Sequence, residues 1–333
     1  MDRANQGTRR DIVVIGASAG GVSALLSLCA RLPENFPAAV LIVLHIGNNT
    51  SVLPMLLTSH GNNRAVHGED GQRIEAGTLY IAPPDHHMQV EDGSIRLTRG
   101  PKEHHTRPAV DPLFRSAALA FGPRVIGVVL TGRLDDGTAG LQAIKDCGGL
   151  ALVQDPAEAE HPSMPRSALH AVRIDRCLPL GAIGEALVQL VDEPAPAALP
   201  AVAVTDRLAR ELAVANGEES PMENLNAIGQ PSSFACPDCD GVLWELKDTR
   251  PPRYRCHTGH AFSLRSLEAT HSTATEDALW AALRALQTRE VLLRQRAEQS
   301  RSVGLADEGA ESEAQAGEAA RHAEVLQRML SQG

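Results

Sequence analysis

The chain lacks any uninterrupted apolar run of the roughly 18 residues that a bilayer-spanning helix needs. Its first ten residues are polar and contain no apolar signal-peptide core. It also lacks an excess of basic charge, because 31 Lys and Arg stand against 41 Asp and Glu and give a formal charge of −10. Binding to nucleic acid or to an anionic membrane requires a basic face. We therefore expect a cytoplasmic protein with no nucleic-acid partner and no direct membrane insertion.

Cysteine is scarce, with six residues in a chain of 333, and it falls into two groups. Cys29, Cys147 and Cys177 stand alone among apolar neighbours, where a free thiol packs as a small hydrophobic side chain. We predict that these three are buried and have no chemical role. The other three cluster with histidines after residue 235, and the whole distribution suits a reducing compartment.

Between residues 11 and 191, short β-branched runs alternate with stretches of helical periodicity, a pattern typical of a parallel sheet covered by helices. The apolar runs cover 11–15, 39–44, 78–81, 125–130 and 150–154, and the helical stretches cover 21–30, 50–59, 110–120, 138–147 and 164–170. Asp92-Gly93 separates two further short runs and predicts a hairpin over 88–98. We expect residues 9–191 to form a doubly wound α/β domain, with a mostly parallel sheet and helices on both faces.

The rest of the chain predicts a linker, a small unit and a helical tail. Residues 192–233 begin with a proline-rich stretch that lacks periodicity, so we expect a linker with one short helix near 205–216 and an irregular end. A compact unit is expected at 234–268. From 275 to 331, leucine and alanine recur at helical spacing. This tail predicts a helical hairpin or one half of a coiled coil, and through it a homo-oligomer.

The first predicted strand runs directly into a glycine-rich turn at 16–21, GASAGG, before a helix begins. Such a turn can hold a phosphate on backbone N–H groups, or it can expose Ser18 as a nucleophile at the end of a sheet. The rest of the sheet favours the nucleophile, because His45 and Asp136 also follow apolar runs. A dinucleotide site would instead place an acidic residue where His45 stands. A serine nucleophile needs an imidazole base, and the imidazole needs a carboxylate, so the pattern predicts a serine hydrolase.

Six motifs then make a family resemblance specific. They are GASAGG at 16–21, a histidine closing the second strand, YIAPPDHHM at 80–88, RPAVD at 107–111, TGRLDDG at 131–137 and MPR at 164–166. Over about residues 9–190 the chain resembles the catalytic domain of the chemotaxis methylesterases, the CheB family. The resemblance implies demethylation of glutamate γ-methyl esters on a chemoreceptor-like helical protein, with glutamine deamidation as a secondary activity and no cofactor for catalysis.

Carried over by motif, the nucleophile falls on Ser18, the base on His45 and the orienting carboxylate on Asp136. By residue type alone the neighbouring Asp135 competes for the last role, and the TGRLDDG motif favours Asp136.

The resemblance further implies an oxyanion hole formed by the backbone N–H of Arg133 and, with less support, that of Ala19. Both positions depart from the best-known relatives, which often carry methionine and threonine there. A catalytically weak adaptor in a chemosensory array, acting through the tail, is therefore the alternative function.

Two pairs of histidines, at 86–87 and 104–105, have no cysteine or acidic residue at ligand spacing. We therefore expect exposed loop histidines there and no metal site. Arg107 and Arg166 are candidates for contacts with an acidic segment of the substrate.

A second cluster has the spacing of a metal site. Cys236 and Cys239 form a C-x-x-C knuckle, and Cys256 precedes His260 by four residues. Two strands too short to hold a core would lie between these pairs, so a structural zinc ion is expected to cross-link them. His257 is the alternative fourth ligand.

The first predicted strand lies close to the start of the sequence, so we expect a standalone form without the N-terminal phospho-acceptor domain that regulates many relatives. The Cys/His segment and the helical tail are then the candidates for regulation.

Overall fold

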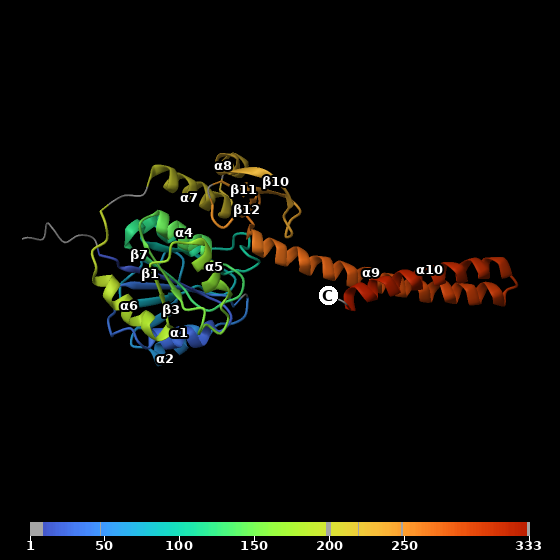
Figure 1. The fold of residues 1–333 in the computed structure, drawn as a ribbon, viewed down its shortest axis with the longest axis horizontal. Helices are drawn as coiled ribbons and strands as arrows, with labels where there is room; N and C mark the ends of the chain where they lie inside the picture. Colours follow the sequence, from blue (N-terminus) through green and yellow to red (C-terminus); the bar gives the residue numbers. More distant parts are fainter. Residues whose placement is uncertain (1–8, 47, 198–200, 219, 248, 332–333) are drawn as a thin grey trace, which may run out of the picture. The chain divides into compact units, whose positions relative to one another are not determined.

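A computed structural model of the chain describes residues 9–331 except 47, 198–200, 219 and 248 (Figure 1). The chain divides into two compact units, one ending at Leu267 and one beginning at Glu268. Part of the expected proline-rich linker, 198–200, lies outside the described residues. Among the described helices none is both long and apolar enough to cross a bilayer.

A seven-stranded sheet forms the centre of the first unit, and every neighbouring pair in it is parallel. In spatial order the strands are β3 (Arg64–His67), β4 (Thr78–Ile81), β2 (Ala39–Leu44), β1 (Ile12–Ala17), β7 (Val125–Val129), β8 (Leu150–Gln154) and β9 (Arg176–Leu178). The predicted parallel sheet is confirmed. The two edge strands, β3 and β9, were not predicted because each is short and half exposed.

Helices cover both faces of this sheet because its strands alternate their side chains between two cores. Ile12 and Val14 of β1 belong to one core cluster, and Val13 and Ile15 belong to the other. The first cluster packs under α3 (Val110–Phe121), α4 (Thr138–Asp146) and α5 (Ser163–Ala171). The second packs under α1 (Gly21–Cys29), α2 (Leu53–His60) and α6 (Leu180–Asp192), which lie on the opposite side of the sheet in Figure 1.

Two smaller features complete the comparison with the predicted domain. The expected hairpin is present as β5 (His87–Glu91) and β6 (Ser94–Thr98). Cys29 and Cys147 are buried, but Cys177 is exposed, so the prediction for that thiol was wrong. The reason is that Cys177 lies on β9, where one edge of the strand has no neighbour in the sheet.

The segment after α6 is more ordered than its composition suggests. It contains α7 (Val202–Ala215), α8 (Pro221–Ile228) and the first part of β10 (Gly229–Ala235). Residues 217–233 were expected to be irregular. Instead, Leu225 and Ile228 of α8 are buried against Trp244 and Leu246, a contact between distant segments that local periodicity does not reveal.

We call residues 229–267 the Cys/His module. Its four strands form an antiparallel sheet in the order β10, β11 (Val242–Leu246), β12 (Arg253–Cys256) and β13 (Ala261–Ser263). A small core fills it, made of Cys236, Leu243, Tyr254, Cys256, Phe262 and Leu267. Six buried side chains form a small core for an independent fold.

The second unit is a pair of helices. Helix α9 (Leu264–Ser302) begins in the module and continues through this unit, and α10 (Ala306–Ser331) follows after a three-residue turn. The helices run antiparallel, with Arg301 paired to Glu313 near the turn at 3.2 Å. Close packing is helped by small buried residues on α10, among them Ala316 and Ala319.

Candidate active site

Ser18 lies in the turn between β1 and α1, at the carboxyl end of the parallel sheet. Its N–H donates to the Thr131 carbonyl at 3.0 Å, which ties the turn to the loop after β7. Gly20 has φ of +75°, a conformation that glycine adopts at little cost. A Cβ on Gly132 would come within 2.9 Å of Ser18 Cβ, so the loop after β7 can approach the serine only as glycine.

His45 and Asp136 meet Ser18 at the same edge of the sheet. His45 follows β2, and its Nδ1 lies 3.1 Å from Ser18 Oγ. Its Nε2 lies 2.7 Å from Asp136 Oδ2. The ring nitrogens are used in the opposite order from the serine proteases, but either nitrogen of a neutral imidazole can accept the serine proton while the other donates to the carboxylate. The geometry thus joins the three predicted residues in one hydrogen-bonded chain.

Asp136 is held as a carboxylate by its surroundings. Its Oδ2 accepts the Val110 N–H at 2.7 Å, and its Oδ1 accepts the N–H groups of Asp111 and Gly137 at 3.0 and 2.8 Å. Burial alone would raise the pKa of this carboxyl, but the hydrogen bond to His45 and the nearby positive charge outweigh burial and hold the pKa well below its ordinary value.

The neighbouring Asp135 differs from Asp136 in its hydrogen bonding and in the direction of its pKa shift. It is also buried, but no hydrogen bond joins it to His45 among the described residues. Burial raises its pKa above the ordinary value. Position and electrostatics therefore both favour Asp136 for the role of orienting the imidazole.

The two N–H groups expected to form an oxyanion hole are available. Among the described residues, neither the Ala19 N–H nor the Arg133 N–H donates a hydrogen bond within the chain. Ala19 directly follows the candidate nucleophile Ser18, and Arg133 directly follows Gly132, which lies against Ser18. Such free donors suit the stabilisation of a developing oxyanion.

A cavity of about 610 Å³ opens beside His45. Lys102, His105 and Arg107 line it together with Asp85. Arg107 holds Asp85 with two hydrogen bonds of 2.9 and 2.7 Å, and hydrogen bonds from Arg107 and then Arg99 lower the pKa of that carboxyl to about 2. Lys102 is exposed and leaves a positive charge at the rim. Arg166, the other predicted contact, is exposed on α5 and does not line this cavity.

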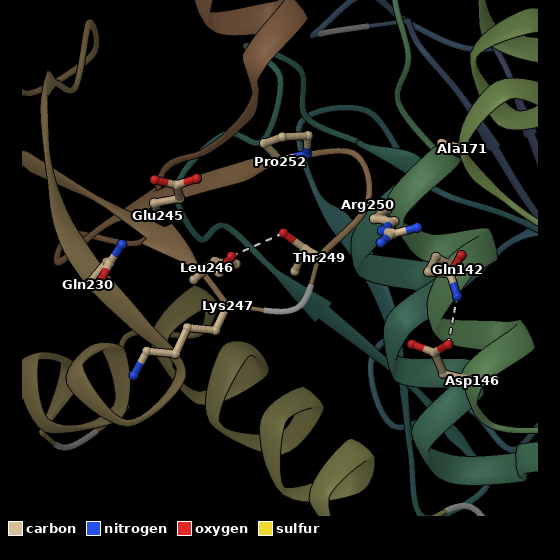
Figure 2. Close-up of a pocket in the computed structure, with 10 residues that line it drawn as sticks. All are labelled: Gln142, Asp146, Ala171, Gln230, Glu245, Leu246, Lys247, Thr249, Arg250 and Pro252. Atoms are coloured by element: carbon tan, nitrogen blue, oxygen red, sulfur yellow. Dashed lines mark hydrogen bonds between the residues drawn. The ribbon is translucent and has the colours of Figure 1, made fainter.

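A second cavity, of about 700 Å³, lies between α4 and the Cys/His module (Figure 2). Gln142, Asp146, Lys247 and Arg250 line it with other polar groups, and no serine, cysteine or histidine is among the described residues of its lining. A serine with an imidazole beside it occurs at Ser18 and not among these residues, which makes the Ser18 site the better candidate for the reactive site.

The histidines at 86–87 and 104–105 were expected to be exposed, and for two of them this prediction was wrong. His87 is 3% exposed and His104 is 6% exposed. Each has partners that a loop sequence does not reveal: His87 Nε2 lies 3.0 Å from the Pro101 carbonyl, and His104 contacts Asp111 and Ser266. Burial lowers the pKa of His87 to about 4.

A buried ion network joins the catalytic domain to the Cys/His module, and sequence reasoning missed it. Glu103 accepts hydrogen bonds from Arg115 at 2.6 Å and from Arg255 at 2.9 Å. Glu211 of α7 accepts from Arg253 at 2.6 Å and from Arg255 at 3.1 Å. No local motif brings these residues together, because they come from four separate segments of the chain.

The cysteine cluster brings four candidate metal ligands together. One ligand atom from each of Cys236, Cys239, Cys256 and His260 lies within 4.8 Å of all the others. Hydrogen bonding, first to Cys236 and then to His260, holds the pKa of Cys256 well below its ordinary value, and the thiolate is the form that binds metal. The alternative ligand, His257, is exposed and lies outside this group.

Comparison with known proteins agrees with the fold of the α/β domain. The family model described as CheB methylesterase matches residues 13–187. A solved structure, the CheB methylesterase catalytic domain of Thermotoga maritima, is 35% identical with a TM-score of 0.53, and the match covers 55% of this chain and all of that chain.

Individual relatives are similar over the same half of the chain. A Leptospira interrogans protein, provisionally named protein-glutamate methylesterase/protein-glutamine glutaminase, is 38% identical over 182 residues, which are 54% of this chain and 94% of that protein. A protein of the same name from Anaeromyxobacter dehalogenans is 40% identical, over 55% of this chain and 54% of the relative. The protein-glutamate methylesterase FrzG of Myxococcus xanthus is 38% identical, over 54% of this chain and 55% of that protein. The chain thus spans only about half the length of the last two relatives.

Proposed function

Because the chain belongs to the CheB methylesterase family, we propose that it hydrolyses γ-methyl esters of glutamate side chains on methylated chemoreceptor-like proteins. The observation that carries this proposal is the hydrogen-bonded series of Ser18, His45 and Asp136 at the carboxyl ends of β1, β2 and β7. The products are a glutamate carboxylate and methanol.

In the proposed mechanism Ser18 Oγ attacks the ester carbonyl carbon while His45 Nδ1 accepts the serine proton. Asp136 stabilises the imidazolium that forms. The N–H groups of Arg133 and Ala19 donate to the oxyanion of the tetrahedral intermediate. Its collapse breaks the bond to the methoxy group, which takes the proton from His45 and leaves as methanol. Water then attacks the acyl-enzyme with His45 again as base, releasing the carboxylate and restoring Ser18.

The same residues can serve glutamine deamidation, with ammonia in place of methanol as the leaving group. Amides resist attack more than esters do, so we propose this activity as secondary. The cavity beside His45 supports an acidic helical segment as substrate, because Lys102 at its rim can attract carboxylates next to the methylated residue.

Methanol release from a methylated receptor preparation tests the proposal. We expect release by the natural chain and none by Ser18→Ala or His45→Ala, with circular dichroism showing that all three are folded. Release that persists in both variants would refute a serine mechanism. If the folded natural chain released no methanol from several receptors, the adaptor function would replace the esterase.

We also propose a structural zinc ion in the Cys/His module, held by Cys236, Cys239, Cys256 and His260. The four ligand atoms lie within 4.8 Å of one another, and four protein ligands leave no open position for catalysis. Zinc analysis of the purified chain should find one equivalent, and His260→Ala should lower it while His257→Ala should not.

A homo-oligomer through the tail is a further part of the proposal. Val291, Leu292, Val325 and Met329 expose apolar side chains on α9 and α10, and a second copy could cover them. Light scattering should show a mass above that of one chain, and Leu292→Glu should reduce it. A monomer at every concentration would rule this assembly out.

A further inference from the structure

Two segments that are distant in the sequence meet behind the triad. The loop before α3 pairs with β13 of the Cys/His module: Glu103 forms a parallel bridge with Ala261, and the His104 N–H donates to the Ala261 carbonyl at 2.9 Å. The His104 ring then lies between two polar partners. Its Nδ1 is 3.1 Å from Ser266 Oγ, and its Nε2 is 3.1 Å from Asp111 Oδ2. One buried imidazole therefore connects the first turn of α9 to the catalytic domain.

Asp111 links the His104 ring to the triad by hydrogen bonds. Its second oxygen, Oδ1, accepts the N–H groups of Gly137 and Gly140 at 3.0 and 2.7 Å. Its own N–H donates to Asp136 Oδ1 at 3.0 Å, and Gly137 donates to the same oxygen at 2.8 Å. The Asp111 carboxylate thus fixes the turn on which Asp136 sits.

We infer that Ser266 and His104 are positioning residues of the esterase: Ser266 orients the His104 ring, and His104 holds the Asp111 carboxylate that sets Asp136 against His45. The inference rests on the proposed function, since it assigns the role through the same triad. It makes the Cys/His module part of the active-site architecture.

The charges around His104 support this role. Asp111, Asp135 and Asp136 are all buried next to it. Burial lowers the pKa of His104, but the hydrogen bond to Asp111 and the charges of Asp136 and Asp111 outweigh burial and raise the pKa to about 9. At neutral pH both ring nitrogens are therefore donors, one toward Ser266 and one toward Asp111.

The backbone gives independent support. His104 and His105 have φ of +51° and +60°, the left-handed region that side chains with a Cβ rarely adopt. Each such residue costs on the order of 1 kcal/mol and persists only where surrounding contacts determine it. Here those contacts come from the module: Ala261 and Ser266 hold His104, while Asp238 and Phe262 contact His105.

A metal ion does not explain this cluster. One ligand atom from each of His104, Asp111 and Asp136 lies within 4.8 Å of the others. However, all four carboxylate oxygens already accept hydrogen bonds, from backbone N–H groups or from the rings of His45 and His104. A cation would have to displace these donors, so the cluster serves the alignment of Asp136.

The test compares substitutions at His104 in the full-length chain. His104→Gln places an amide N–H near the position of Nε2 and can keep the bond to Asp111, whereas His104→Asn keeps a group near Nδ1 and loses that bond. We expect kcat to fall about 100-fold in the Asn variant, about 10-fold in the Gln variant and about 10-fold in Ser266→Ala, each with less than about a two-fold change in KM. Asparagine tolerates a positive φ better than histidine, so backbone strain cannot explain its larger loss.

Trp244→Phe is the matched control within the module. It removes one partly buried hydrogen bond, from Trp244 Nε1 to Asn226 Oδ1 at 3.0 Å, at a site that does not contact the triad. Its kcat should equal that of the natural chain at a temperature where circular dichroism shows both folded.

A second readout separates this inference from the proposed function. A fluorophosphonate modifies an activated serine without any ester turnover, and its rate at Ser18 should fall in the same order, with the Asn variant slowest. If the natural chain released no methanol, the proposed function would fail, and these rates would still decide the inference. Equal rates in folded natural chain and His104→Asn would overturn it. So would a rise in KM alone, because the contact would then belong to receptor docking.

Discussion

The esterase triad and the interface of the Cys/His module lie in the same compact unit but are stabilised in different ways. Ser18, His45 and Asp136 occupy the ends of strands in one parallel sheet, and two hydrogen bonds join them. The module is held by buried charges, with Glu103 and Glu211 each bound by arginines. The residues of a site at strand ends can be identified from short sequence motifs. The stability of an interface of buried ions, in contrast, depends on every partner being present. Substitutions in the triad should therefore affect chemistry, and substitutions in the buried ion network should affect stability.

Ser18→Ala should show the largest effect and only on chemistry. Loss of the nucleophile is expected to lower kcat by about 10,000-fold or more, while the free energy of unfolding changes by less than about 0.5 kcal/mol because Ser18 is only partly buried. Initial rates of methanol release and urea unfolding measure the two quantities. The control is Ser59→Ala at an exposed position on α2, which should change neither.

Glu103→Gln should show the reverse pattern, with a large loss of stability. The amide removes one of the two carboxylates that face the guanidinium groups of Arg115 and Arg255 in a buried site, which costs about 3 kcal/mol in the free energy of unfolding. Glu91→Gln is the control, because the pair with Arg96 is at the surface and should be worth less than about 1 kcal/mol. Equal losses in the two variants would show that burial does not separate these ion pairs.

Removal of metal by a chelator should unfold the Cys/His module before the seven-stranded sheet. The module's small core depends on the proposed cross-link through Cys236 and Cys256, so Tm should fall by several degrees and early loss of structure should be confined to residues 229–267. Hydrogen exchange followed by mass spectrometry locates the loss. Uniform loss across β1, β2 and the module would contradict this order.

The stability of the module interface should depend on pH through two buried groups that act with opposite signs. Because the folded pKa of His104 is raised from 6.5 to about 9, its contribution is complete below pH 6.5 and is lost as the pH rises toward 9. The opposite sign applies to Glu103, whose pKa is lowered from 4.5 to about 2, so its contribution is complete above pH 4.5 and is lost as the pH falls toward 2. We expect the natural chain to lose about 2 kcal/mol more than His104→Asn between pH 6.5 and 9, measured by urea unfolding. Parallel curves would show that His104 does not titrate in this range.

Lys102→Ala should have the smallest effect and only on substrate binding. The ammonium is exposed at the rim of the cavity beside His45, where solvent screens its attraction for an acidic segment. KM for a methylated receptor should rise about three-fold at low salt and converge with the natural value at high salt, with kcat unchanged. A fall in kcat would instead place this residue in the chemistry.

Most of the α/β domain could be predicted because its signals are local. Alternating runs located β1, β2, β4, β7 and β8, and the motifs placed Ser18, His45 and Asp136 at the same sheet edge. The short strands β3 and β9 and the helix α8 escaped prediction, because their burial depends on neighbours far away in the chain. The same reason explains the error at His104, whose loop sequence looks exposed but whose ring is covered by Ser266.

Local motifs were enough to identify the family, the order of the proposed triad residues and the spacing of the four candidate metal ligands, because each is encoded in residues that stand close together in a motif. The folded structure was needed to show that Glu103, Arg115, Glu211 and Arg255 form one buried network, and that the module reaches the triad through His104. The physical reason is that burying a charge is favourable only when its partners surround it in space. Those partners come from segments whose proximity exists only after the chain has folded.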